Sequence, residues 1–312
     1  MNNVIYEMSE LNKTENLING ALLIFAVDKE ERSQFALKKM LALESKGNKA
    51  IIFAYEKDAT VEEAIDDVGN IVNEDVAIID GFPTSQYEFV CNLKERKEIH
   101  FAEKIVIDVS SILTPYLFLL IKYIKVCNPE AKVFAINTIP FDYTFPASPF
   151  VSYRSYFGNL IMEEVFGFSS SQGLLKDKEL FIFAGFEGAL AMKVVEDTEY
   201  NQLYYVNALP SYHQKYKDIN FINNYHLLVS KNCKRLYAPA INPFEVYNLL
   251  DKYVKDDTEV SIAPLCTKPM SLGICMYALG HQNVRIIYPF SDKYKTELSH
   301  DVYKSYVYKL VL

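Results

Sequence analysis

The chain has 312 residues and a formal net charge of −8, with 32 Lys and Arg against 40 Asp and Glu. Half of the residues are hydrophobic and 23% are charged, which is typical of a globular protein and excludes a disordered or fibrous one. The acidic balance argues against bulk nucleic-acid binding, because such surfaces carry an excess of Lys and Arg. The length allows two domains of about 150 residues each.

Neither the N-terminus nor the apolar stretches indicate a membrane protein. The first residues include acidic side chains and have no basic region before an apolar core, unlike a secretory signal. The most apolar segment, 110–127, contains Lys122 and Lys125, and a spanning helix needs about 18 uncharged residues. We therefore expect a cytoplasmic protein with no membrane partner. The five cysteines form no C-x-x-C pair, which excludes a disulfide framework and structural zinc, and no cofactor is indicated.

The first half alternates between apolar runs of strand length and amphipathic runs of helix length. A buried strand is expected at 20–28, and helical periodicity follows over 30–47 and ends at Gly47. Further strands are expected at 49–56, 75–80, 104–109 and 132–137, with helices at 61–72 and around 117–126. Uninterrupted β-branched runs separated by helices are typical of a parallel sheet covered on both faces.

Residues 141–178 interrupt this alternation with several prolines and glycines. The segment is also rich in aromatic side chains, namely Phe141, Tyr143, Phe145, Phe150, Tyr153, Tyr156 and Phe157. This aromatic density is too high for a disordered linker. We expect a crossing segment that packs at an interface between domains.

The alternation then restarts. Strands are expected at 179–185, 203–210, 235–240, 259–265 and 283–289, with helices at 186–197, 219–231, 243–255 and 268–280. The alternating Tyr and Lys of 303–312 predict a final antiparallel edge strand. The sequence thus predicts an α/β fold of two Rossmann-like domains, 1–140 and 179–312, with mainly parallel sheets and helices on both faces. No sequence repeat relates the two halves.

Ligands of open α/β sheets bind outside the carboxyl ends of the strands. In the first half, that rule selects Asp28, Glu56, Asp80, Asp108, Ser110, Ser111 and Asn137. Carboxylates at a sheet edge can hold Mg²⁺ or exchange protons, and we take Asp80 and Asp108 as candidate catalytic residues. Ser110 and Ser111 are candidate ligand contacts. Asp and Ser at these positions also cap the following helix, and that alternative stays open.

In the second half, Gly185, Glu187 and Gly188 form the turn after the first strand and are candidate ligand contacts. Glycine lets a backbone pass close to a ligand, although the Glu187 carboxylate would repel a phosphate. Thr267 and Lys268 open a later helix, where backbone N–H groups and the macrodipole favour an anion. Gly273, one turn further, allows close helix packing or ligand approach. A capped helix with a solvated lysine is the alternative.

The C-T-K-P-M run at 266–270 resembles the G-T-K-x-M turn of CARF-type sensor domains in bacterial defence proteins. Cys266 stands where that pattern has glycine. The resemblance implies a Rossmann-like domain that binds cyclic oligoadenylates at the sheet edge, with Thr267 and Lys268 as ligand contacts. More broadly, D-V-S-S at 108–111, G-F-E-G at 185–188 and T-K-P at 267–269 are similar to uncharacterised two-domain proteins found with bacterial defence genes, for which no reaction is assigned.

Three hypotheses follow. The first is a ligand-binding or regulatory component of a bacterial defence or signalling system, which binds a nucleotide-like or phosphorylated ligand near Thr267 and Lys268. It would act with a protein partner from the same operon, and a homodimer is an open alternative. The second is a metal-assisted enzyme that processes a nucleotide with Asp80 and Asp108. The third is a non-catalytic interaction scaffold.

Overall fold

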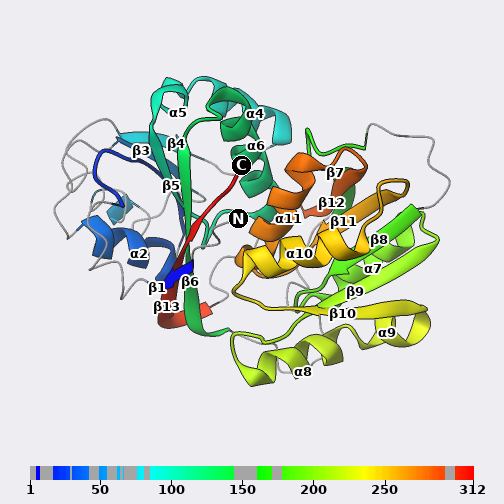
Figure 1. Cartoon of the computed structure of the whole chain (residues 1–312). Coiled ribbons are helices and arrows are strands. Elements are labelled where there is room, and N and C mark those ends of the chain that lie inside the picture. Colours follow the sequence, from blue (N-terminus) through cyan, green and yellow to red (C-terminus); the bar gives the residue numbers. More distant parts are fainter. Residues whose placement is uncertain are drawn as a thin grey trace. The chain divides into compact units, whose positions relative to one another are not determined.

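The computed structural model describes residues 5–7, 17–28, 30–41, 49–54, 62–63, 66, 76–80, 85–143, 160–170, 178–291 and 299–312. The chain divides into two compact units, each with its own sheet (Figure 1). The first unit comprises Met1–Thr144 and Thr296–Leu312, and the second comprises Phe145–Lys295. The α/β class, with two mainly parallel sheets, agrees with the sequence prediction.

The sheet of the first unit has seven described strands in the order β1-β13-β6-β5-β2-β3-β4. They are β1 (Ile5–Glu7), β2 (Leu22–Val27), β3 (Lys49–Ala54), β4 (Val76–Asp80), β5 (Lys104–Asp108), β6 (Lys132–Tyr143) and β13 (Ser299–Lys309). The helices are α2 (Arg32–Leu41), α4 (Gln86–Lys94), α5 (Lys97–Phe101) and α6 (Thr114–Cys127). Strands β2 to β6 pair in parallel, and β13 pairs antiparallel with β6 and with β1.

The sheet of the second unit has six described strands in the order β10-β9-β8-β11-β12-β7. They are β7 (Leu160–Glu164), β8 (Lys178–Phe183), β9 (Gln202–Ala208), β10 (Cys233–Ala238), β11 (Glu259–Pro264) and β12 (Val284–Ser291). The helices are α7 (Gly188–Asp197), α8 (Gln214–Asn223), α9 (Tyr225–Ser230), α10 (Pro243–Tyr253) and α11 (Lys268–Gly280). The edge strand β7 is antiparallel to β12.

The two sheets share one strand order. In each, the first parallel strand lies between the second and the fourth, and an antiparallel strand pairs with the fifth. In the first sheet, the chain adds β3 and β4 on one side of β2 and then β5 and β6 on the other side, so the order of strands reverses between β2 and β5. The same reversal occurs between β8 and β11 in the second sheet. Such a reversal is the switch point where open α/β sheets bind their ligands.

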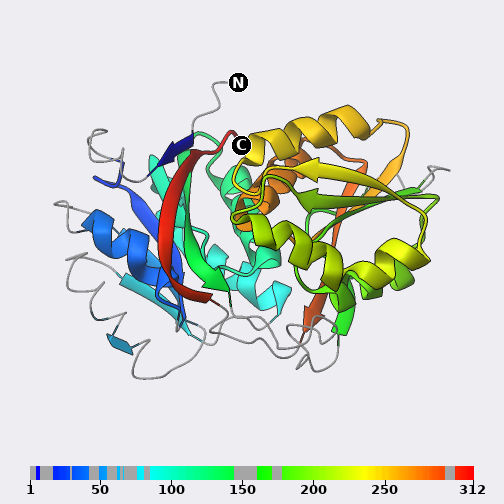
Figure 2. The ribbon, with the colours of Figure 1, turned by 90° about the horizontal axis from the view of Figure 1, so that it is seen from below.

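Helices cover both faces of each sheet, and successive side chains of a strand point to opposite faces and so contact different helices. Phe25 and Ile52 of the first sheet pack with Ala36 of α2, whereas Phe53, the neighbour of Ile52, contacts Phe89 of α4 on the opposite face. In the second sheet, residues of β8 and β9 pack with α7 and α9, while Tyr204 contacts Tyr253 of α10. Figure 2 shows α10 on one side of this sheet and α8 and α9 on the other.

Helices α6 and α11 each follow the fourth parallel strand of their sheet. Each opens with a proline in the first turn and is buried over most of its length. This explains why the segment at 110–127 is so apolar. Within the described ranges, no helix combines the length and the apolar character needed to cross a bilayer.

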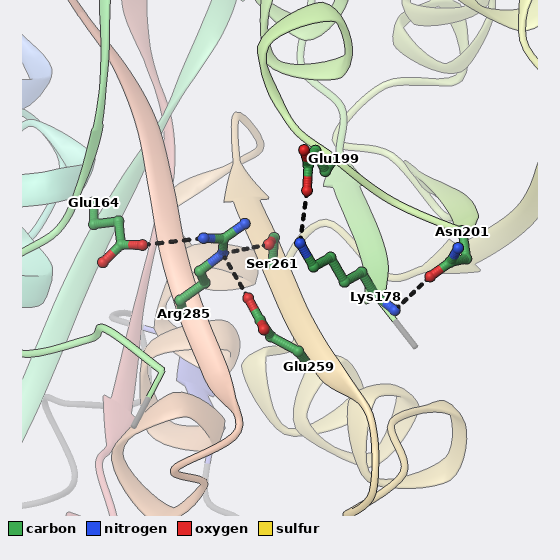
Figure 3. A network of polar contacts seen from close by, with 7 residues as sticks. All are labelled: Glu164, Lys178, Glu199, Asn201, Glu259, Ser261 and Arg285. Atoms are coloured by element: carbon green, nitrogen blue, oxygen red, sulfur yellow. Dashed lines mark hydrogen bonds and ion pairs between the residues drawn. The ribbon is translucent and has the colours of Figure 1, made fainter. Parts of the chain in front are cut away.

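A network of charges joins three strands at the amino ends of the second parallel sheet (Figure 3). Arg285 of β12 donates from Nε to the Ser261 hydroxyl of β11 at 2.7 Å and from Nη1 to Glu164 of β7 at 3.2 Å. Its Nε also lies 3.6 Å from the Glu259 carboxylate, which opens β11. At the start of β8, Lys178 pairs with Glu199 at 2.7 Å. This edge ties the antiparallel strand to the sheet, and it is opposite to the carboxyl edge, the edge at which open α/β sheets generally bind ligands.

The structure differs from the expected domain limits at the C-terminus. Residues 296–312, expected to complete the second domain, belong to the first unit, because β13 pairs with β6 along its length. Part of the expected crossing segment forms β7, which belongs to the second sheet, while 144–159 and 171–177 lie outside the described residues. The helix expected at 61–72 also falls largely outside them.

Candidate functional site

The turns after β8 and β11 meet at the switch point of the second sheet. Gly185 follows β8, and a Cβ atom built on it would lie 2.1 Å from the carbonyl oxygen of Leu265, which follows β11. No side chain fits there, because real Cβ atoms essentially never come closer than 3.0 Å. The sheet therefore brings the predicted Gly185–Gly188 turn next to the predicted Thr267 and Lys268.

Three asparagines of the α8–α9 region hold the turn that follows β8. Asn220 donates from its amide to the carbonyls of residues 184 and 185 at 2.9 and 3.0 Å. Asn224 donates to the carbonyl of residue 185 at 2.9 Å, and Asn223 to that of residue 186 at 2.8 Å. The buried Tyr205 hydroxyl donates in turn to the Asn220 amide oxygen and fixes its orientation. We call Asn220, Asn223 and Asn224 the asparagine clamp.

The asparagine clamp determines where the peptide N–H groups of this turn point. In a trans peptide, the carbonyl of one residue and the N–H of the next point in opposite directions. Because the carbonyls of residues 184–186 face the asparagine clamp, the N–H groups of residues 185–187 point away from it. Successive N–H groups with one orientation favour an anion. The turn thus has a backbone arrangement that suits an anion, and no motif in the sequence predicts it.

Thr267 and Lys268 lie where the sequence predicts them, at the start of α11. The Thr267 hydroxyl donates to the carbonyl of Ala240 at 2.7 Å, so it holds the loop after β10 and keeps its lone pairs. Burial raises the pKa of the neighbouring Cys266 to about 12, which keeps that side chain a neutral thiol rather than a nucleophile.

The other two predicted glycines make close contacts with the chain's own backbone. A Cβ on Gly188 would lie 1.9 Å from the carbonyl oxygen of Asn223, so Gly188 lets α7 approach the asparagine clamp. A Cβ on Gly273 would lie 2.2 Å from the carbonyl oxygen of Pro243, at the crossing of α10 and α11. Of the two readings of Gly273, close helix packing is the one that this contact supports.

In the first sheet, the switch point between β2 and β5 holds two carboxylates. Asp28 directly follows β2 and is 8% exposed, and Asp108 ends β5 and is 4% exposed. Asp80 ends β4, and its side chain lies outside the described part of the chain. Strands β2 and β3 separate β4 from β5, which spaces the ends of β4 and β5 by about 14 Å across the sheet. The carboxylate that the fold brings to Asp108 is therefore that of Asp28.

Asp108 uses one of its two oxygens within the protein. Its Oδ1 accepts the Ser110 N–H at 2.9 Å, while its buried Oδ2 has no hydrogen-bond partner among the described residues. Burial raises the pKa of Asp108 to about 7, because the charged form loses its hydration. The hydroxyl and N–H of Ser110 and the Arg32 charge lower this pKa, and the Asp28 charge raises it. A carboxyl group that titrates near neutral pH can exchange protons or bind a cation.

Asp28 interacts with two charged residues, Glu30 and Arg32, that the strand-end rule does not select. Its Oδ1 accepts the Glu30 N–H at 2.8 Å, and Glu30 accepts from Arg32 Nε at 2.5 Å. Burial and the Glu30 charge raise the pKa of Asp28 to about 6. The Arg32 guanidinium lies 5.7 Å from the centre of the Tyr143 ring at the end of β6. The sequence does indicate that Glu30 and Arg32 could belong to the site, because both closely follow the aspartate at the end of a predicted strand.

Ser110 and Ser111 lie beside these carboxylates. The Ser110 hydroxyl accepts the Thr138 N–H of β6 at 2.9 Å, so it fixes the turn after β5 to the neighbouring strand. Ser111 is buried close to Asp28, and its hydroxyl lowers the pKa of that carboxyl. Within the ranges that the structure describes, no three His, Cys, Asp or Glu side chains form a group that could hold a metal ion.

No family model and no curated protein matches this chain. Among solved structures, the cytoplasmic domain of a prokaryotic cation chloride cotransporter is 9% identical over 88% of this chain and 96% of that one, with a TM-score of 0.28. A functionally unknown protein from Pseudomonas aeruginosa PAO1 is 10% identical over 88% of this chain and 94% of that one, with a TM-score of 0.25. Similarities of this size assign neither a family nor a function.

Proposed function

We propose that this protein is a ligand-binding or regulatory protein whose ligand carries a phosphate or another anionic group. The ligand binds at the switch point of the second sheet, between the turn at 185–188 and the start of α11. A nucleotide-like ligand and a role in bacterial defence signalling, as the resemblance at 266–270 implies, belong to the same proposal.

The observation that carries the proposal is the asparagine clamp. It turns the N–H groups of residues 185–187 to one side and holds them without help from a ligand. A preorganised donor set binds an anion more tightly than a flexible one, because less conformational entropy is lost on binding. Across Gly185 and Leu265, the N-terminus of α11 adds its macrodipole and the Lys268 charge.

Binding is tested by isothermal calorimetry on the full chain with AMP, ATP, cyclic oligoadenylates and inorganic pyrophosphate. We expect at least one of them to bind, and we expect Lys268→Ala to weaken it about tenfold or more through the loss of a charge-assisted contact. Glu187→Gln should strengthen binding, because it removes a carboxylate from the anion's surroundings. Lys231→Ala, a change of a lysine at the C-cap of α9 that is half-buried like Lys268, is the matched control.

Two results would contradict the proposal. The first is that none of the four anions binds to the wild-type chain. The second is that Lys231→Ala and Lys268→Ala weaken binding equally, which would indicate a diffuse charge effect instead of a site at α11.

A further inference from the structure

Among the described residues, the switch point of the first sheet holds three buried carboxyl groups and one guanidinium group. The carboxylates of Asp28, Glu30 and Asp108 act on one another and on the Arg32 guanidinium. Arg32 is most closely engaged by Glu30, with 2.5 Å between Nε and Oε2. Among the described residues, Asp28 and Asp108 form no ion pair, and the more distant Arg32 charge lowers the pKa of both.

Asp108 shows where a ligand would bind. The residue is 4% exposed, and its Oδ2 is buried with no hydrogen-bond partner among the described residues. A buried polar atom without a partner is unfavourable, and the penalty is larger for a charged group. Oδ2 belongs to the strand-end carboxylate at the switch point, where ligands of open α/β sheets bind. A cation or a hydrogen-bond donor from outside the chain would supply the missing partner.

The set of side chains selects among cations. Structural zinc sites use four protein ligands and catalytic ones usually three, and Ca²⁺ takes six to eight oxygens. No such group of three exists in the part of the chain that the structure describes. Mg²⁺ differs, because it keeps several of its water molecules and binds through one or two carboxylates. We infer that the switch point of the first sheet is a Mg²⁺ site, with Asp108 Oδ2 as its direct ligand and Asp28 as its second carboxylate.

This inference concerns different residues from the proposed anion site. They lie in the other unit, on a different sheet, and take a ligand of the opposite charge. The inference rests on the geometry of Asp108 and Asp28 and does not depend on the ligand of the second sheet. Failure of either inference leaves the other standing.

The test is a calorimetric titration of MgCl₂ into the full chain at constant ionic strength, with NaCl as the reference salt. We expect saturable binding of about one Mg²⁺ per chain, and about tenfold or more weaker binding in Asp108→Asn, which keeps the shape of the side chain. Asp28→Asn should weaken binding to a smaller extent. Asp251→Asn, a change of an exposed aspartate on α10, should bind Mg²⁺ like the wild type.

The proposal is overturned if MgCl₂ gives no saturable signal beyond that of NaCl, or if Asp108→Asn binds Mg²⁺ like the wild type. If Asp108→Asn does not fold, electron paramagnetic resonance of Mn²⁺ added to the wild-type chain decides the matter. One bound Mn²⁺ that is displaced by Mg²⁺ and weakened by Asp28→Asn supports the site. Unbound Mn²⁺, or binding that Asp28→Asn leaves unchanged, rejects it.

Discussion

At the scale of single residues, the two switch points differ in which groups hold the turns. In the second sheet, neutral amides of the asparagine clamp bind backbone carbonyls. In the first sheet, Asp28 and Asp108 accept backbone N–H groups two residues further along, so their carboxyl groups hold the turns and remain titratable groups at the edge. At Asp108 this is not the helix capping that the sequence left open, because the N-cap of α6 is Leu113, which makes no side-chain cap hydrogen bond. Asp108 holds the turn before that helix, with one oxygen of two.

The raised pKa values of Asp28 and Asp108 predict how stability depends on pH. In the fold, the pKa is about 6 for Asp28 and about 7 for Asp108, against an ordinary value of 3.8, so between these values the folded state binds more protons than the unfolded one. Stability should therefore fall as the pH rises through this range.

Asp108→Asn removes one of the two titrating groups. Between about pH 5 and about pH 8, the free energy of unfolding should fall in both proteins. The fall should be smaller in the variant than in the wild type by about 2–3 kcal/mol, as measured by urea unfolding in metal-free buffer. Asp251→Asn, on the exposed face of α10, should leave the pH dependence unchanged. A wild-type chain that gains stability over this range would contradict the prediction.

At the scale of elements, the buried helix α11 is held close to α10 by a glycine. Gly273 faces the Pro243 carbonyl, and a Cβ atom would also lie 2.7 Å from the Val246 side chain. Since Pro243 opens α10, a larger residue at 273 must separate the two helices or bend one of them. The same helix starts with Thr267 and Lys268, so its position matters for the proposed anion site.

Gly273→Ala is expected to destabilise the second unit by about 1–3 kcal/mol, the usual effect of overpacking. Its control lies in the same helix. A Cβ on Gly280 would meet no atom within 4 Å, so Gly280→Ala should stabilise by up to about 1 kcal/mol through helix propensity. Urea unfolding followed by circular dichroism measures both variants. Equal effects of the two changes would show that α10 and α11 are not in close contact at Gly273.

At the scale of the whole molecule, the last strand belongs to the first unit although the second unit precedes it in the chain. Strand β13 buries Tyr308 against the sheet and pairs it with Ala135 of β6. A buried hydrogen bond of 2.8 Å joins the hydroxyls of Thr138 and Ser305 across the same pair of strands. The first unit is therefore complete only when the C-terminus has been added.

Tyr308→Ala should destabilise the first unit by about 3–5 kcal/mol, as large core truncations do. Hydrogen exchange measured by mass spectrometry should show faster exchange in β2, β5 and β6, while β8 and β11 keep their protection, because each unit has its own core. Tyr303→Ala, a change in the same strand at a residue that is 49% exposed, should have little effect. Loss of protection in both sheets would contradict the division into two units.

The sequence by itself determined the α/β class and the place of most strands and helices, because the period of hydrophobic residues is a local property. It also selected Asp108, Thr267 and Lys268, since strand ends and helix starts can be found from that period. Only the tertiary structure decided that Asp28 and not Asp80 neighbours Asp108, that three asparagines orient the turn at Gly185, and that β13 completes the first sheet. These contacts join residues far apart in the chain, and hydrophobic periodicity carries no information about which strands will pair.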